Sequence, residues 1–173
     1  MSSVQIYALD HLVLTVSDLS ATVAFYERLG MQREMFNGDR IALHFGAQKL
    51  NLHRTGAEVE PHARYPTVGS ADLCFLVEGP LEQVFDALAT AGIRVELGPV
   101  ERTGATGPMR SLYVRDPDGN LVELSEMQAG SGAHHRPCWI ADRRAGDLRE
   151  TSGSSSTPEA KGAMHGHDQH LQC

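Results

Sequence analysis

Two segments of the chain alternate apolar and polar residues, as half-buried strands do. The aliphatic positions are Leu12, Leu14 and Val16 in the segment 10–16, and Leu73, Phe75 and Val77 in the segment 71–77. The opposite face carries His11 in the first segment and Asp72 in the second. Each segment therefore predicts a strand that packs its aliphatic face on a helix and turns its polar face away.

A helical pattern follows each of these strands. Residues 19–29 place Leu19, Val23, Tyr26 and Leu29 at helical spacing, and Gly30 stops the pattern. Residues 80–92 begin with Pro80, which suits a first helical turn, and Gly92 ends them.

Further strands are predicted after each helix, at 39–46 and 48–53 in the first half, and at 93–98, 109–116 and 120–126 in the second. The order of strand, helix and further strands thus occurs twice. We therefore expect one module over residues 4–57, a linker with two prolines over 58–70, and a second module over 71–128.

Residues 129–173 lack this periodicity. They are rich in Gly, Ser, Ala and charged residues, so they bury too little apolar surface to offset chain entropy, and we expect a disordered tail. The tail also holds five of the nine histidines, and its His165, His167 and His170 could bind metal adventitiously.

Composition excludes some classes of partner. The chain has 173 residues, of which 41% are hydrophobic and 21% charged, and a formal charge of −7, which argues against nucleic-acid binding. No apolar run approaches a membrane span, and the first residues lack the basic start of a signal peptide, so we expect a cytoplasmic protein. Three widely spaced cysteines predict no disulfide framework, and Cys74 is expected in the core.

Candidate chemistry lies on the polar faces of the strands. Asp72 falls where His11 falls in the first half, and Glu123 falls where Asn51 falls, with His53 two residues beyond Asn51. Taken singly, a strand histidine or carboxylate is usually hydrogen-bonded or solvated. Together, imidazole and carboxylate groups on matching strands suit Zn²⁺, Ni²⁺, Co²⁺, Mn²⁺ or Fe²⁺.

The segments ALDHLVLTVSDLSATVAFYERLGM, FGAQKLNLH and SLYVRDPDGNLVELSE resemble the vicinal oxygen chelate (VOC) superfamily. This superfamily includes glyoxalase I, fosfomycin- and bleomycin-resistance proteins and extradiol dioxygenases. Within it, residues 69–84 and 98–123 are most similar to the branch of glyoxalase domain-containing protein 5 and related bacterial virulence proteins.

The resemblance implies an α+β fold of two tandem βαβββ modules, whose mixed sheets curl into an open cup with the helices outside. It also implies a divalent metal in the cup, which is often completed across a homodimer. By position, the metal ligands are His11, Asp72 and Glu123. Asn51 stands where glyoxalase I would have a carboxylate, and His53 could replace it as a ligand. Glu123 is the candidate catalytic base.

The implied activity is that of a metal-dependent, glyoxalase-like enzyme of the lyase or isomerase type, acting on a small molecule with adjacent oxygens. Two alternatives stay open: a ring-cleaving Fe(II) dioxygenase that uses His11, His53 and Glu123, and a non-catalytic binding protein of the resistance type. The candidate substrate-binding residues are Asn51, Arg102, Tyr113 and Arg115.

Overall fold

The computed structural model describes residues 3–128, so the predictions for the tail at 129–173 lie outside the described residues. Module one comprises β1 (His11–Val16), α1 (Leu19–Arg28), β2 (Gln32–Phe36), β3 (Arg40–Phe45) and β4 (Gln48–Arg54). Module two comprises β5 (Asp72–Leu76), α2 (Leu81–Thr90), β6 (Leu97–Thr103), β7 (Pro108–Arg115) and β8 (Leu121–Met127). Within residues 3–128, neither helix is long and apolar enough to cross a membrane.

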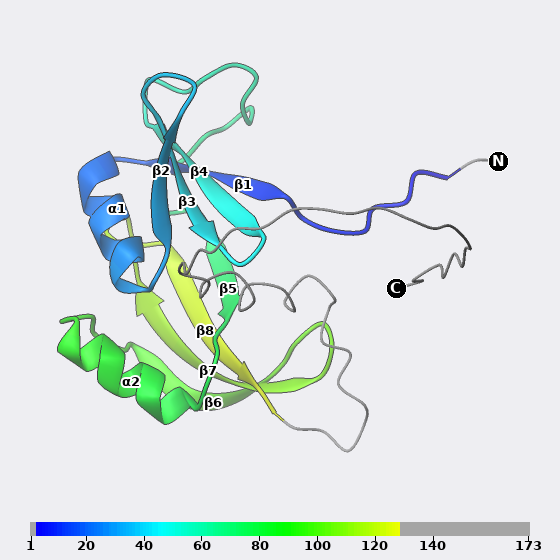
Figure 1. Ribbon diagram of the computed structural model, residues 1–173, viewed down its shortest axis with the longest axis vertical. Coiled ribbons are helices and arrows are strands. Elements are labelled where there is room, and N and C mark those ends of the chain that lie inside the picture. The colour runs from blue at the N-terminus through cyan, green and yellow to red at the C-terminus, as the bar shows by residue number, and fades with distance from the viewer. Residues whose placement is uncertain (1–2, 129–173) are drawn as a thin grey trace, which may run out of the picture. The chain divides into compact units, whose positions relative to one another are not determined.

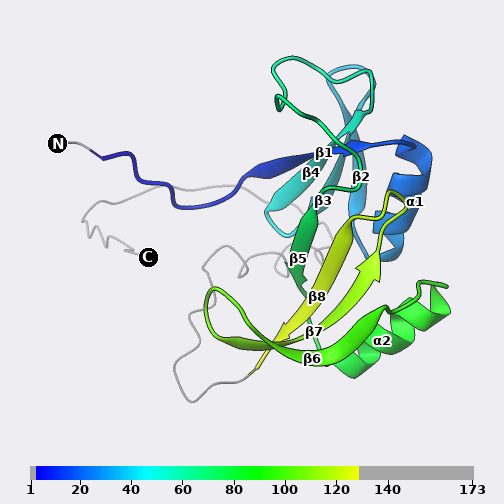
Figure 2. The ribbon, with the colours of Figure 1, turned by 180° about the vertical axis from the view of Figure 1, so that it is seen from behind.

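The two modules share one topology. The strand order is β1-β4-β3-β2 in one sheet and β5-β8-β7-β6 in the other. In each sheet the first and last strands of the module are parallel neighbours and the other pairs are antiparallel. Figures 1 and 2 show both helices on the same side of the sheets. These features confirm the predicted α+β fold of mixed sheets, which stay open as a cup requires.

The predicted aliphatic faces form the core. Leu14 and Val16 of β1, and Val122 and Leu124 of β8, are at most 4% exposed. They join one buried cluster with α1, which contributes the fully buried Tyr26. The opposite face of each sheet is therefore left for polar side chains.

Two strands differ from the sequence prediction. β2 was not predicted, because it is an edge strand with no buried residue and so lacks the alternation of a half-buried strand. The strand predicted at 93–98 begins only at Leu97 and extends to Thr103. Within β6 the pairing with β7 shifts register between Leu97 and Val100, where Gly98 lies so close to β7 that a Cβ there would overlap the carbonyl oxygen of Ser111.

The turn before β8 joins the two modules. Asp116, which is buried, accepts hydrogen bonds from Tyr26 Oη of α1 at 3.1 Å and from Asn120 Nδ2 at 2.8 Å. Asp118 accepts bonds from the backbone N–H and the hydroxyl of Ser17, just before α1. Asn120 in turn accepts the N–H of Ala71 at 2.9 Å. We call this set of contacts the clasp, and it fixes where β8 starts.

Candidate functional site

The polar face of module one lies on β1 and β4. Register places His11 opposite Lys49, Val13 opposite Asn51, and Thr15 opposite His53. Directly paired residues share a face of the sheet, so His11, Asn51 and His53 lie on the same side. The three candidate residues of module one thus share one face, although Thr15, the partner of His53, lies four residues beyond His11 along β1.

Asn51 and His53 are buried, each 5% exposed. Within residues 3–128, neither Asn51 Oδ1 nor either ring nitrogen of His53 has a hydrogen-bond partner. Burial lowers the pKa of His53, and the charges of Arg40 and His62 lower it further. Both effects favour the neutral imidazole, and its ring nitrogens have no partner in the described part of the chain. Buried polar atoms normally have partners, so these atoms indicate a place for a ligand.

His11 is oriented by its neighbour in the chain. Its Nδ1 donates to Asp10 Oδ1 at 2.7 Å, and this bond lowers the pKa of Asp10. A histidine that gives one ring N–H to a carboxylate is typical of metal sites, because the other nitrogen is then free to coordinate. The donor chemistry of module one therefore fits a divalent metal.

Cations also lie on this face of module one. Lys49 Nζ is 4.6 Å and the Arg40 guanidinium 4.9 Å from the centre of the Phe36 ring. Within residues 3–128 neither cation is in an ion pair, although the chain as a whole is acidic. Their charge is therefore available to a negatively charged ligand.

The polar face of module two centres on Glu123. Its Oε1 accepts a hydrogen bond from the hydroxyl of Ser125 at 3.3 Å, and Ser125 also contacts Ser111 at 2.8 Å and Cys74 Sγ at 3.4 Å.

The prediction that Cys74 is a core residue is wrong, because its thiol is on the exposed side of β5. The alternation of Cys74 with Leu73 and Phe75 was the sequence signal that puts the thiol on the face opposite these apolar side chains. Partial burial raises the pKa of the thiol.

Tyr113 and Arg102 flank Glu123. Register pairs Tyr113 with Glu123, and Arg102 Nε donates to Tyr113 Oη at 2.8 Å. Burial raises the pKa of Tyr113 and so does Glu123, while Arg102 opposes them. Arg102 also donates to the Glu101 carbonyl, and within residues 3–128 it has no carboxylate partner. The rim of module two therefore offers a phenol and a guanidinium next to a carboxylate.

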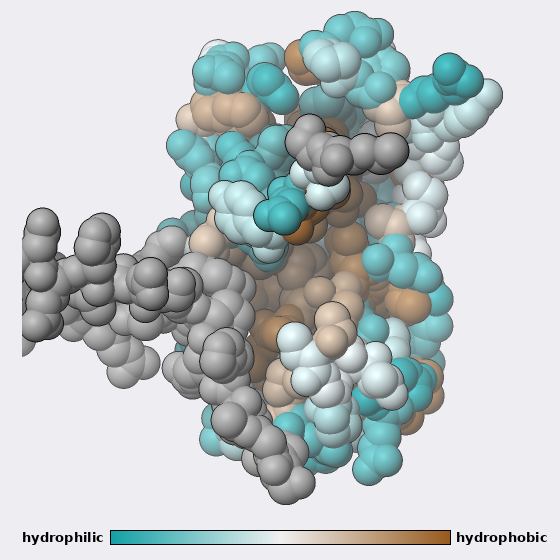
Figure 3. All heavy atoms as spheres, turned by 90° about the vertical axis from the view of Figure 1, so that its right-hand side faces the viewer, coloured by the Kyte–Doolittle hydropathy of each residue, from teal (hydrophilic) through white to brown (hydrophobic). Residues whose placement is uncertain are grey.

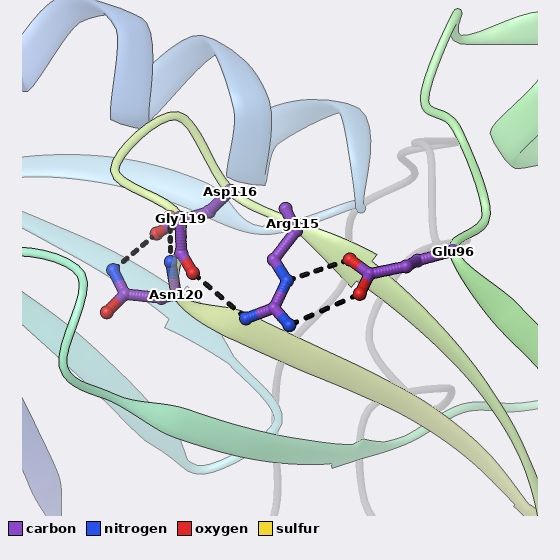
Figure 4. Close-up of polar contacts among 5 residues, drawn as sticks. All are labelled: Glu96, Arg115, Asp116, Gly119 and Asn120. Carbon is purple, nitrogen blue, oxygen red and sulfur yellow. Dashed lines mark hydrogen bonds and ion pairs between the residues drawn. The ribbon is translucent and has the colours of Figure 1, made fainter.

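Two predicted site residues have other surroundings. The donors of Arg115 are directed to both carboxylate oxygens of Glu96 and to the Gly119 carbonyl, as Figure 4 shows, so its contacts are structural. Asp72 is exposed and pairs in register with Leu121, two residues before Glu123. It therefore shares the face of Glu123, and its side chain makes no hydrogen bond or ion pair among residues 3–128.

The candidate residues form two half-sites, one in each module. The half-site of module one is His11, Asn51 and His53, and that of module two is Asp72 and Glu123. Residues 3–128 contain no cluster of three His, Cys, Asp or Glu side chains that could hold a metal ion. Each half-site thus has suitable donors, but further donors are needed to enclose a metal.

Apolar surface lies close to the half-sites. Figure 3 shows the side away from the helices, where apolar residues gather in a hollow that hydrophilic residues surround. Val13 of β1 and Leu76 of β5, on the same sheet faces as the half-sites, are 41% and 63% exposed. Two clefts lie elsewhere. One, of about 690 Å³, is lined by α2 and by residues 92–98 and contains no predicted site residue, and another, of about 520 Å³, includes Arg115.

Known proteins with the same fold were found by sequence and by structure. Virulence protein STM3117 of Salmonella typhimurium is 56% identical over 119 residues, which cover 68% of this chain and 83% of that protein. Its crystal structure has a TM-score of 0.71 and covers 72% of this chain and all of that one. Glyoxalase domain-containing protein RDO1 of Mycosarcoma maydis is 52% identical over 121 residues, covering 70% and 69% of the two chains.

A more distant match is the crystal structure of lactoylglutathione lyase from Agrobacterium tumefaciens. It has a TM-score of 0.55 and 26% identity, and it covers 70% of this chain and 95% of that one. The sequence profile of the glyoxalase/bleomycin resistance protein/dioxygenase superfamily matches residues 8–124, which span both half-sites. The chain belongs to the glyoxalase/bleomycin resistance protein/dioxygenase superfamily.

Proposed function

We propose that the protein is a metal-dependent, glyoxalase-like enzyme of the lyase or isomerase type. The observation that carries this proposal is that buried polar atoms of Asn51 and His53, on the same sheet face as His11, have no partner among residues 3–128. The similarity to a lactoylglutathione lyase supports the same reaction class. The metal would be held by His11, His53, Asp72 and Glu123, and would polarise two adjacent oxygens of a small substrate.

The residues of module two have roles in handling the substrate. The Glu123 carboxylate accepts and returns the proton that moves between neighbouring carbons, as a general base does. Ser125 holds its Oε1, and Tyr113 lies across the strand from it. The Arg102 guanidinium, which donates to Tyr113 and to the Glu101 carbonyl, supplies positive charge for a carboxylate or similar anion of the substrate. Asn51 donates to or accepts from the substrate. For Arg115, the contacts with Glu96 favour a role in holding the strand end.

We also infer a homodimer in which two copies complete each site. β1 and β5 are edge strands, and among residues 3–128 each has a neighbour on one side only. An exposed edge strand has unpaired backbone N–H and C=O groups that can bind an edge strand of another chain. Joining β1 of one copy to β5 of the other would place a half-site of module one next to a half-site of module two, twice by symmetry.

Metal content and turnover test this function. The full chain is loaded with Ni²⁺ or Zn²⁺ and assayed with methylglyoxal plus glutathione and with other 2-oxo aldehydes. We expect turnover that falls by roughly 10²–10⁴-fold in Glu123→Gln, and bound metal that is lost in His53→Ala. A variant that lacks His165, His167 and His170 of the tail controls for adventitious binding. Absence of turnover with every 2-oxo aldehyde would contradict the proposal.

Asn51 favours a second candidate, a protein that sequesters a small molecule without turning it over. Asn51 stands where glyoxalase I would have a carboxylate, and an amide is a weak metal ligand and not a base. This candidate predicts saturable ligand binding that is unchanged by Glu123→Gln and by metal removal. Oxygen uptake with catechols after Fe²⁺ loading would instead indicate the dioxygenase chemistry of His11, His53 and Glu123.

A further inference from the structure

The segment before β1 exposes an unusual amount of apolar surface. We call residues 3–10 the arm, and its Val4, Ile6, Tyr7 and Leu9 are 92%, 89%, 99% and 59% exposed. Single exposed apolar side chains are normal on proteins, but a contiguous group of them marks an interaction surface. Residues 3–9 carry no charged side chain, so the only charge of the arm is at its end, on Asp10.

The arm is tied to the sheet only at its end. Gln48 Nε2 donates to the Leu9 carbonyl at 2.9 Å, and the Lys49 N–H donates to the Asp10 carbonyl at 3.4 Å. Residues 3–8 make no hydrogen bond within the part of the chain that the structure describes. Figure 1 shows the arm running away from the sheets, in continuation of β1. Its apolar side chains are therefore not covered by residues 3–128.

Both sides of the arm are apolar. In an extended chain successive side chains point to opposite sides, which puts Val4 and Ile6 on one side and Tyr7 and Leu9 on the other. A strand that is apolar on both sides is typical of one that is buried on both sides. The arm therefore suits a groove or an interface between layers better than it suits an open protein surface.

We propose that the arm packs against a second copy of this chain. This inference rests on the proposed homodimer, in which the open edge of β1 pairs with β5 of the other copy. Because the arm leads directly into β1, that pairing carries residues 3–10 onto the partner. Two-fold symmetry then buries both arms and closes all four open edges of β1 and β5, whereas an unrelated partner would satisfy one edge only. Residues 1–9 contain no Lys or Arg, which argues against a membrane surface.

Self-association of the full chain tests the proposal by analytical ultracentrifugation. The test variant is Ile6→Ser/Tyr7→Ser, and the matched control is Val59→Ser/Tyr65→Ser, whose side chains are 41% and 82% exposed between the modules. We expect a wild-type dimer, a control that dimerises as the wild type does, and a test variant whose dissociation constant is raised by about 100-fold or more. Residues 3–8 make no hydrogen bond within residues 3–128, so the test variant and the control should have equal melting temperatures at a dilution at which both are monomeric.

Other results would overturn the proposal. If the wild type and the test variant dimerise equally, the arm does not contribute and the homodimer stands. If the wild type is monomeric, the arm proposal and the homodimer both fail, while turnover still decides the proposed activity. Arm-dependent binding of a monomer to phosphatidylserine vesicles would also contradict the proposal. Hydrogen exchange of the wild type gives a second measurement, because amides at 3–8 should gain protection as the protein concentration rises.

Discussion

At the scale of single residues, Arg115 is a good example of a charge with a structural role. It binds Glu96 through two nitrogens, at 2.8 and 3.3 Å, and reaches the Gly119 carbonyl at 3.1 Å (Figure 4). Arg115 lowers the pKa of Glu96, and Glu96 raises that of Arg115. The pair joins β7 to the segment before β6 and steadies the turn that leads to Glu123.

The pair should make stability depend on pH in one direction. Because the pKa of Glu96 is lower in the folded state, the pair stabilises the fold above the ordinary value near 4.5, and this contribution is lost as the pH falls through the folded-state pKa. We therefore expect Arg115→Gln to be slightly less stable than wild type at pH 7, with the difference disappearing in acid. Urea unfolding at pH 7 and pH 3 measures it. An equal loss at both pH values would mean that Arg115 acts through packing alone.

Strand alternation in the sequence predicts which face of the sheet each site residue occupies, but not which other residues it contacts. Alternation places His11, Asn51 and His53 on one face and Glu123 on the other module's equivalent face. It also places Cys74 beside Glu123, although apolar neighbours favoured the core. The partners of Arg115 and Arg102 were beyond prediction, because long side chains choose between several nearby acceptors in three dimensions.

At the scale of elements, α2 shows how a strand can cap a helix. The helix begins after Pro80, which has no side-chain acceptor, and Glu126 of β8 accepts the N–H of Leu81 at 3.1 Å. Arg110 of β7 lies between Glu126 and Glu82 of the helix, with its nitrogens 3.7 and 2.7 Å from them. The start of α2 thus depends on two strands of its own module. α1, in contrast, is capped locally by Asp18.

Removing this distant cap should loosen the start of α2. Glu126→Ala is expected to cost about 1 kcal/mol of unfolding free energy, as the loss of an N-cap does, because an N–H at the helix start loses its acceptor. Glu126→Gln keeps an acceptor and should lose less. Hydrogen exchange should report faster opening at Leu81 in the alanine variant. Unchanged exchange there would show that water replaces Glu126 without cost.

Element prediction succeeded where one face is buried. β1, β4 and β8 bury aliphatic side chains and β5 half-buries Leu73 and Phe75, so their alternation was clear in the sequence. β2 lacked this signal because both of its faces are largely exposed. β6 pairs with β7 through a register shift at Gly98 and a close approach to Ser111, which are contacts between segments that local periodicity does not contain.

At the scale of the whole molecule, the two modules are held together by the clasp and by aromatic contact. Phe45 of β3 and Phe75 of β5 meet edge to face, with ring centres 5.0 Å apart. The clasp adds buried hydrogen bonds from Tyr26 to Asp116 and exposed ones from Ser17 to Asp118. The buried core is continuous through both modules, so we expect one cooperative unit.

Weakening the clasp should separate the behaviour of the modules. Asp118→Ala removes the acceptor for Ser17 and is expected to cost about 1–2 kcal/mol. Asp39→Ala, in an exposed turn of module one, is the control and should change little. Native-state hydrogen exchange should then show different opening free energies for β1–β4 and β5–β8 in the clasp variant only. If the modules still open together, the aromatic contact and core suffice to couple them.

The parallel pairing of first and last strands also has a consequence for how the protein is made. β1 finds its neighbour only when β4 has been synthesised, and β5 likewise waits for β8. Because these contacts join residues far apart in the sequence, each sheet is expected to fold more slowly than a sheet built from successive hairpins. On the ribosome, module one can close once residue 54 has emerged, whereas the clasp needs residues 116–120. The part of the module one core that packs against module two would then stay exposed until nearly the whole of module two has been translated.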